Sequence, residues 1–223
     1  MSIKRVFALF INDFNDCIKD KLFIKINFIF ILFFSLPVFF FWPAGSSLSF
    51  FKPARLDVGV PLIYFIEIVF ISILLTLDFF KFNNVISFQG WIKKNNLNKK
   101  EVFWGKLLSY WFLVLFLIFQ TLPLYILFFF YGIFSLKTVL YFYGIGIMIS
   151  FVFVSLGISG NFIKISVDMK DILLFGISII YFSGLFYTST ITMKGVNISF
   201  YYHLAWLGLT WIYLFKFVIL SRS

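Results

Sequence analysis

The chain has 223 residues, of which 62% are hydrophobic and 13% are charged, whereas a soluble domain averages about 45–50% apolar and about 25% charged residues. This composition excludes a soluble globular protein, because the charged side chains are too few to cover its surface. The single Cys17 and the single His203 exclude an intrachain disulfide, a cysteine metal cluster and a two-histidine zinc site within the chain.

Residues 3–22 predict an amphipathic helix that lies in the lipid headgroup plane. Apolar residues recur at three- and four-residue steps, and most charged residues fall elsewhere; the apolar positions are Phe7, Phe10, Phe14, Ile18 and Leu22. The alternative is a plain extension of the first membrane span. No cleavable signal peptide is expected, because three aspartates precede the first long apolar run.

Six further segments are long and apolar enough to cross a bilayer core, which takes about 20 helical residues. We therefore expect an all-α, polytopic membrane protein with one permease-like domain over residues 1–223, an N-terminal interfacial helix over residues 1–23 and a cytoplasmic loop between the second and third spans. The expected spans are residues 24–43, 59–80, 107–131, 138–163, 172–191 and 201–220.

The net charge of +10 is concentrated on one side of this predicted topology. Fifteen of the 19 Lys and Arg residues fall at the two termini or between spans on the terminal side, and four fall on the other side. Positive residues mark the cytoplasmic side of membrane proteins. This distribution places both termini and the loop over residues 81–106 in the cytoplasm, and it favours a membrane protein over a nucleic-acid-binding one.

Two polar residues are candidate sites for transport or cargo. Glu67 is the one carboxylate well inside a predicted span, where it is either a substrate or proton site or a shielded glutamate between helices. His203 begins the sixth span near the predicted outer face, where it is either a contact for haem or a haem chaperone or a polar anchor at the interface. No metal site is expected within the chain.

The sequence contains no phosphate-binding loop, no HExxH and no GxSxG motif, so we expect no catalytic residues and no enzyme activity in this chain. The cytoplasmic loop instead carries the short apolar stretch VISFQGWI over residues 85–92. A helix with one apolar face there either docks in the groove of a soluble partner or rests on anionic lipid.

The layout resembles type 2 ABC transporter permeases, and several motifs resemble the cytochrome c maturation permease, also called haem exporter protein B. TLDFFKFNN over residues 76–84 and SFQGWI over residues 87–92 resemble the segments around that family's ATPase-coupling loop. Asn83 and Asn84 stand where the family has acidic residues. The resemblance implies an ATPase-coupling role for Asn83, Asn84, Phe88, Gln89, Gly90 and Trp91.

GKLLSYWFLVLFLIFQTLPL over residues 105–124 resembles the family's Lys-x-x-x-His-Trp segment with its downstream Leu-Pro. Tyr110 stands at the histidine position. The segments over residues 155–174 and 215–223 also resemble the family, so the likeness covers nearly the whole chain. The positions that match or replace family residues here and in the preceding motif are Asp78, Lys106, Tyr110, Trp111 and Pro123.

The resemblance implies an inner-membrane homodimer that works with an ATP-binding subunit, a haem-handling membrane subunit and a periplasmic haem chaperone. ATP is used by the partner subunit, this chain holds no tightly bound cofactor, and haem is a candidate cargo. Either the bacterial inner membrane or, for an organelle-encoded chain, the mitochondrial inner membrane is implied. The alternatives are another type 2 export permease for lipid, glycan or peptide, and a membrane scaffold without transport activity.

Overall fold

The computed structural model describes residues 2–41, 68–73, 92, 95–130, 135–160, 167–191 and 196–214. The regular structure in these ranges is entirely α-helical, as predicted. The helices that the structure bounds are α1 (Ile3–Lys19), α2 (Lys21–Phe41), α5 (Lys99–Gln120), α6 (Leu122–Phe130), α7 (Leu136–Gly160), α8 (Val167–Ile191) and α9 (Val196–Leu214).

The amphipathic N-terminal segment forms a helix of its own. Asp20 takes an extended backbone conformation (φ −70°, ψ 132°) and separates α1 from α2. Its N–H bonds to the carbonyl oxygen of Cys17 at 3.1 Å, so the last turn of α1 stays capped. The separate N-terminal helix is therefore confirmed and the alternative, a plain extension of the first span, is not; the boundary lies a few residues earlier than the expected 23/24 junction.

The expected third span, residues 107–131, is two helices that meet at Thr121. Pro123 has no N–H to donate to the carbonyl of Phe119, so the helical hydrogen-bond ladder is interrupted there. The N–H of Thr121 closes the end of α5 on the carbonyls of Ile118 and Phe119. Pro123 then occupies the first turn of α6, where a missing N–H costs little.

The beginning of α5 extends eight residues before the expected span. Asn98 caps the helix, because its side-chain oxygen accepts the N–H of Lys100 at 3.0 Å. The basic residues that follow therefore belong to the first turn of a long helix rather than to a loop. The last eight residues of the expected loop over residues 81–106 are therefore helical.

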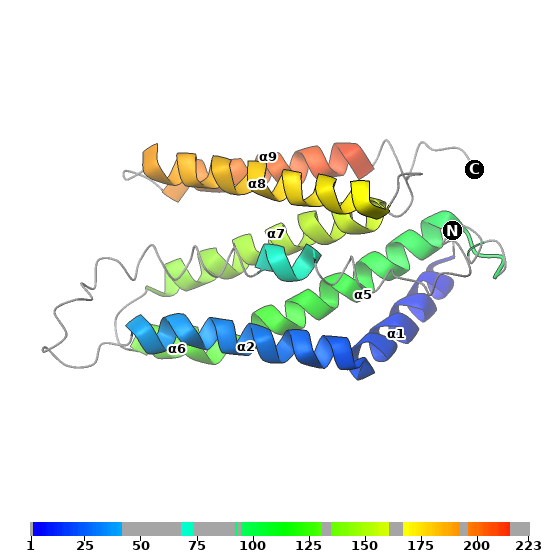
Figure 1. Cartoon of the computed structure of the whole chain (residues 1–223), viewed down its shortest axis with the longest axis horizontal. Helices are drawn as coiled ribbons and strands as arrows, with labels where there is room; N and C mark the ends of the chain where they lie inside the picture. The colour runs from blue at the N-terminus through cyan, green and yellow to red at the C-terminus, as the bar shows by residue number, and fades with distance from the viewer. Residues whose placement is uncertain are drawn as a thin grey trace, which may run out of the picture.

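The described helices run back and forth along the long axis of the molecule (Figure 1). The beginnings of α2, α5 and α8 and the ends of α7 and α9 lie at the end where Figure 1 marks the N-terminus. The opposite end holds the end of α2, all of α6 and the beginnings of α7 and α9. The distribution of Lys and Arg in the sequence predicts that the helix ends near the N-terminus lie on the cytoplasmic side. It predicts that those at the opposite end lie on the outer side.

The core is built around α5 and α7. Helix α5 contacts α1, α2, α6 and α7, and α7 also contacts α8 and α9. Leu107, Leu113 and Leu117 of α5 and Phe153 of α7 are almost completely buried. Two described helical segments, Lys99–Gln120 and Val139–Ser159, are long and apolar enough to cross a membrane.

The outer surface of the described helices carries many large apolar side chains. Phe28 on α2, Phe116 on α5, Phe175 on α8 and Ile212 on α9 are each at least 45% exposed. A soluble monomer rarely exposes contiguous apolar patches beyond a few hundred Å². Helices that are apolar on both their buried and their exposed faces match a lipid environment.

Candidate functional site

The most polar contact in the described core lies between α1 and the first half of α5, which we call the α1–α5 seam. It joins side chains from the first 17 residues to residues about 90 positions later. Its members are Val6, Leu9, Phe10, Asp13 and Cys17 of α1, and Glu101, Gly105, Lys106, Ser109 and Tyr110 of α5.

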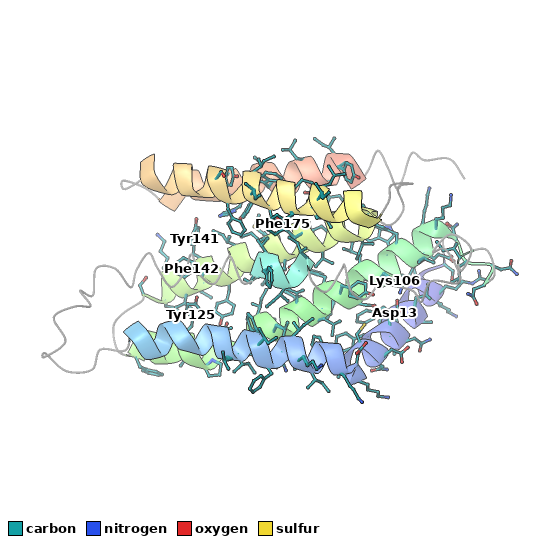
Figure 2. The ribbon with its side chains drawn as sticks, viewed as in Figure 1. Asp13, Lys106, Tyr125, Tyr141, Phe142 and Phe175 are labelled. Atoms are coloured by element: carbon teal, nitrogen blue, oxygen red, sulfur yellow. The ribbon has the colours of Figure 1, made fainter. Side chains whose placement is uncertain are left out.

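An ion pair crosses the middle of the seam. Lys106 Nζ donates to Asp13 Oδ2 at 2.9 Å, and the two side chains are only 8% and 21% exposed. Figure 2 shows both at the same end of the molecule, between α1 and α5. Each charge of this partly buried pair depends on the other, because removing one leaves its partner without compensation.

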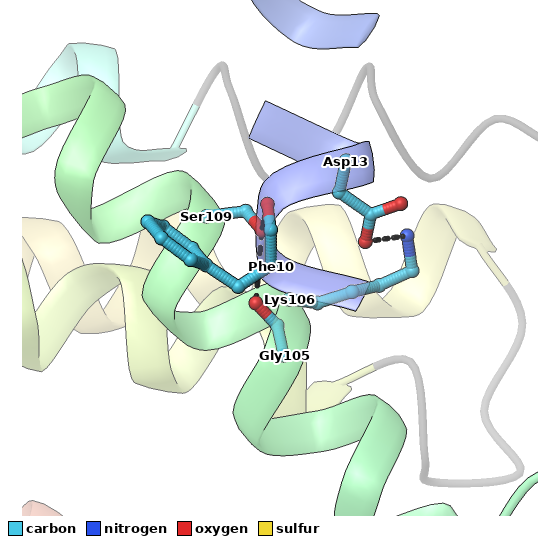
Figure 3. A network of polar contacts seen from close by, with 5 residues as sticks. All are labelled: Phe10, Asp13, Gly105, Lys106 and Ser109. Carbon is cyan, nitrogen blue, oxygen red and sulfur yellow. Dashed lines mark hydrogen bonds and ion pairs between the residues drawn. The ribbon is translucent and has the colours of Figure 1, made fainter. Parts of the chain in front are cut away.

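Gly105 and Ser109 let the two helices approach closely. A Cβ added at Gly105 would lie 2.8 Å from Leu9 Cβ and 3.3 Å from the Val6 carbonyl oxygen, so a glycine is required for this packing. One turn later, the Ser109 hydroxyl lies 3.1 Å from the Phe10 carbonyl oxygen and 2.9 Å from the Gly105 carbonyl oxygen (Figure 3). Small residues four apart support close helix packing.

A second charged contact closes the N-terminal end of the seam. The Ser2 N–H donates to Glu101 Oε1 at 2.7 Å, and Arg5 lies 3.9 Å from Glu101 Oε2. Glu101 is buried although it sits in the first turn of α5, where the positive end of the helix dipole favours a carboxylate. This end of α1 is therefore attached to α5 by both a hydrogen bond and charge.

Cys17 lies at the other end of the seam. Burial, with a smaller contribution from the nearby Asp13 carboxylate, raises the pKa of its thiol to about 12. A thiol that stays protonated is a poor nucleophile and a poor metal ligand. Cys17 therefore serves the packing of α1 rather than chemistry.

The family-like positions on α5 all take part in packing. Lys106 forms the ion pair described above, and Tyr110 is buried in the core. Trp111 Nε1 donates to Ser150 Oγ on α7 at 3.2 Å. These three residues thus join α5 to α1 on one side and to α7 on the other. Pro123 is exposed at the beginning of α6.

The polar contacts at the far end of α5 are interhelical. Thr121 Oγ1 and the Tyr143 hydroxyl are 2.8 Å apart, which joins the α5–α6 break to α7. Tyr125 of α6 is fully buried and its ring packs near Phe142 and Tyr143. Figure 2 shows Tyr125 and Phe142 at the end of the molecule opposite the seam.

His203 lies inside the bundle rather than at an exposed interface. It is 2% exposed, and its Nδ1 lies 2.8 Å from the Tyr181 hydroxyl of α8. Tyr202 donates its hydroxyl to the Tyr181 carbonyl at 2.8 Å, and Trp206 packs edge-on against the same ring. An outer-face haem or chaperone contact would first require His203 to be exposed, and both roles predicted for it, this contact and an interfacial anchor, stay predictions.

Several predicted site residues lie outside the part of the chain that the structure describes. They are Glu67, Asp78 and the coupling-loop residues Asn83, Asn84, Phe88, Gln89, Gly90 and Trp91. Their roles stay predictions. In the described ranges, no three His, Cys, Asp or Glu side chains come together in a group that could hold a metal ion.

Neither a protein-family model, nor a curated protein, nor a solved structure is similar to this chain. The functional assignment therefore depends on the residues themselves and on the packing described above.

The sequence did not reveal the partners across the seam. It placed Asp13 among the polar residues of the N-terminal helix and Lys106 in a cytoplasmic loop, with no reason to join them. The usable signal was the pair Gly105 and Ser109, which places two small residues on one face of a helix, as in close-packed membrane helices.

Proposed function

We propose that this chain is the membrane-embedded permease subunit of an ABC-type transporter that acts in haem delivery for cytochrome c biogenesis. A separate subunit hydrolyses ATP, and this chain converts that energy into release or export of haem or of a haem-loaded chaperone. The protein lies in an inner membrane as a homodimer with both termini in the cytoplasm.

The observation that carries the proposal is the combination of an apolar outer surface with a polar, charged seam at one end. Large apolar side chains are exposed on α2, α5, α8 and α9, whereas the buried ion pair of Lys106 and Asp13 lies where the sequence expects the cytoplasm. Lipid favours the first feature, and the charge distribution of the chain favours that position for the second.

The seam also gives a mechanical reason for this assignment. The cytoplasmic loop over residues 81–98 leads directly into α5, and α5 is fixed to α1 over the length of the seam. A force applied to the loop by a soluble ATPase would move α1 and α5 as one body. The rigid part of such a coupling is tightly packed helix, and the hinge is a break such as Thr121.

The haem assignment depends on the ordered family-like residues. Lys106, Tyr110 and Trp111 occupy the positions of the family's Lys, His and Trp, and each packs at a contact between helices. Another type 2 permease, for lipid, glycan or peptide, would also use the seam. The experiment must therefore distinguish haem delivery from transport of another cargo.

Deletion of the gene tests the cargo directly. We expect holo-cytochrome c to fall to background, while apo-cytochrome c continues to be made, and a plasmid copy of the gene to restore the holo form. Haem staining and immunoblotting of the same membranes separate the two forms. Normal holo-cytochrome c in the deletion strain would contradict the haem assignment and leave a permease with another cargo.

The coupling role is tested with Phe88→Ala and Trp91→Ala. Buried aromatic anchors dominate interface energies at roughly 2 kcal/mol or more each, so we expect each change to reduce the ATPase that copurifies with this chain. Phe116→Ala is the control, because it removes an exposed aromatic of α5 outside both the loop and the seam. Equal ATPase recovery from all three variants would remove the loop from the coupling site.

A further inference from the structure

Helix α1 has three faces, and one of them is turned away from both lipid and α5. The seam face packs on α5, and a second face carries the exposed apolar stripe Ile3, Phe7, Ile11 and Ile18. The third face includes Arg5, Ala8 and Asn12. At 3.6 residues per turn its centre is roughly 130° round the helix from the stripe, so it is turned toward water when the stripe faces lipid.

This third face lines a recess of about 340 Å³ together with the turn that precedes α5. Arg5, Ala8, Leu9 and Asn12 form one wall, and Asn95, Asn96 and Leu97 form the other. Asn96 has a left-handed backbone (φ 50°), and the Leu97 N–H bonds to the Ile92 carbonyl at 3.1 Å. Asparagine is one of the few residues that adopts this conformation readily, so the turn has a defined shape.

The chemistry of the lining selects an anion. It contains one guanidinium and three carboxamides, and no acidic side chain. Arg5 lines the recess and its side chain is 65% exposed, and its ion pair with Glu101 is a long one of 3.9 Å, so the guanidinium is accessible to a ligand. A guanidinium binds phosphate and carboxylate oxygens through paired N–H donors.

The surroundings are positive as well. Lys99 and Lys100 begin α5 directly after the turn, and the N-terminus of that helix adds partial positive charge. Asp13 is paired with Lys106, and Glu101 accepts the Ser2 N–H and lies 3.9 Å from Arg5; neither carboxylate belongs to the lining of the recess. A phosphate offers more acceptor oxygens than a carboxylate does, so it could accept from groups on both walls of the recess at once.

We propose that the recess between α1 and the turn before α5 is a binding site for the phosphate group of a small soluble anion. Its volume lies at the lower end of the range for small-molecule sites, which matches a diphosphate or a compact phosphate ester. The site does not depend on the identity of the transported cargo. Occupation would bridge α1 to the cytoplasmic loop, since Arg5 and Asn12 lie on one element and Asn95 and Asn96 on the other.

Calorimetric titration of the full-length protein in detergent with inorganic pyrophosphate tests the proposal. We expect saturable binding at one site per chain. Arg5→Gln and Asn12→Leu should each weaken it about tenfold or more, as expected for lost charge-assisted or buried hydrogen bonds. Lys19→Gln is the matched control, because Lys19 is an exposed cation of α1 outside the recess and its removal changes the net charge equally.

Three results would overturn the proposal. One is the absence of saturable heat, and another is equal weakening by Arg5→Gln and Lys19→Gln, which would indicate general charge attraction. The third is a response seen only in nanodiscs that contain phosphatidic acid and never with pyrophosphate, which would assign the phosphate to a lipid headgroup. Asn12→Leu leaves Glu101 and its contacts intact, so it separates loss of the site from damage to the seam.

Discussion

Substitution of Gly105 by alanine should loosen α1 from α5. The added Cβ would lie 2.8 Å from Leu9 Cβ and 3.3 Å from the Val6 carbonyl oxygen. The first distance is too short for two non-bonded carbon atoms. The second is a tight contact with a backbone atom, which cannot rotate away as a side chain can. Overpacking of this kind costs about 1–3 kcal/mol, while replacing a helical glycine with alanine gains about 1 kcal/mol of helix propensity.

Gly144→Ala gives the matched control, because Gly144 lies in α7, is also helical and has no atom within 4 Å of its added Cβ. The propensity gain is common to both variants, so their difference isolates the clash. We expect Gly105→Ala to have a free energy of unfolding about 1–3 kcal/mol lower than Gly144→Ala.

Unfolding by sodium dodecyl sulfate in mixed micelles, followed by circular dichroism, measures this difference. Hydrogen exchange then locates it, because faster exchange should be confined to α1 and the first turns of α5. Equal stability of the two variants, or faster exchange spread evenly over α7 and α9, would refute the close packing at Gly105.

Three further predictions concern other contacts. Asp13→Asn should destabilise the protein because it leaves the Lys106 ammonium, which is 8% exposed, without its partner; the loss should stay below the about 3–5 kcal/mol of a fully buried pair, since Asp13 is 21% exposed. Lys106→Met in the same chain should recover part of the loss, and strict additivity of the two changes in unfolding titrations would contradict the ion pair. Because its pKa is raised to about 12, Cys17 should react with iodoacetamide at pH 8 only after unfolding, with about 1,000-fold less thiolate than at the ordinary pKa of 9.0; mass spectrometry showing rapid native labelling would contradict that burial. Gly184→Ala should weaken the packing of α8 on α9, because the added Cβ would collide with the Tyr202 hydroxyl of α9, whereas a Cβ at Gly176 on the same helix has no atom within 4 Å. Equal thermal stabilities of these two variants would contradict the collision.

Composition and periodicity were sufficient for the all-helical class of the described residues. The expected ranges 138–163, 172–191 and 201–220 overlap α7, α8 and α9, whose described boundaries differ from them by zero to six residues. Helix boundaries are set by caps and breaks, and these are local. Asn98 caps α5 ahead of the expected span, and the missing N–H of Pro123 ends it early, although the apolar run itself continues.

The contacts between helices could not be derived in the same way. The partner of Lys106 is 93 positions away, and apolar periodicity says only which face of a helix is buried, never what buries it. The burial of His203 could not be derived from its sequence neighbours either. Its neighbours Tyr201 and Tyr202 are typical of a membrane interface, but a hydrogen bond to Tyr181 offsets the cost of burying the imidazole.

Purification of the tagged protein from its native membrane in mild detergent, with mass spectrometry of the copurifying chains, tests whether this chain is the permease of a haem-delivering ABC complex. We expect to recover an ATP-binding subunit together with haem-handling proteins, in a preparation where a control ABC complex stays intact. An ATP-binding subunit without haem-handling proteins would contradict the cargo. Recovery of this chain without any ATP-binding subunit would contradict the permease assignment itself.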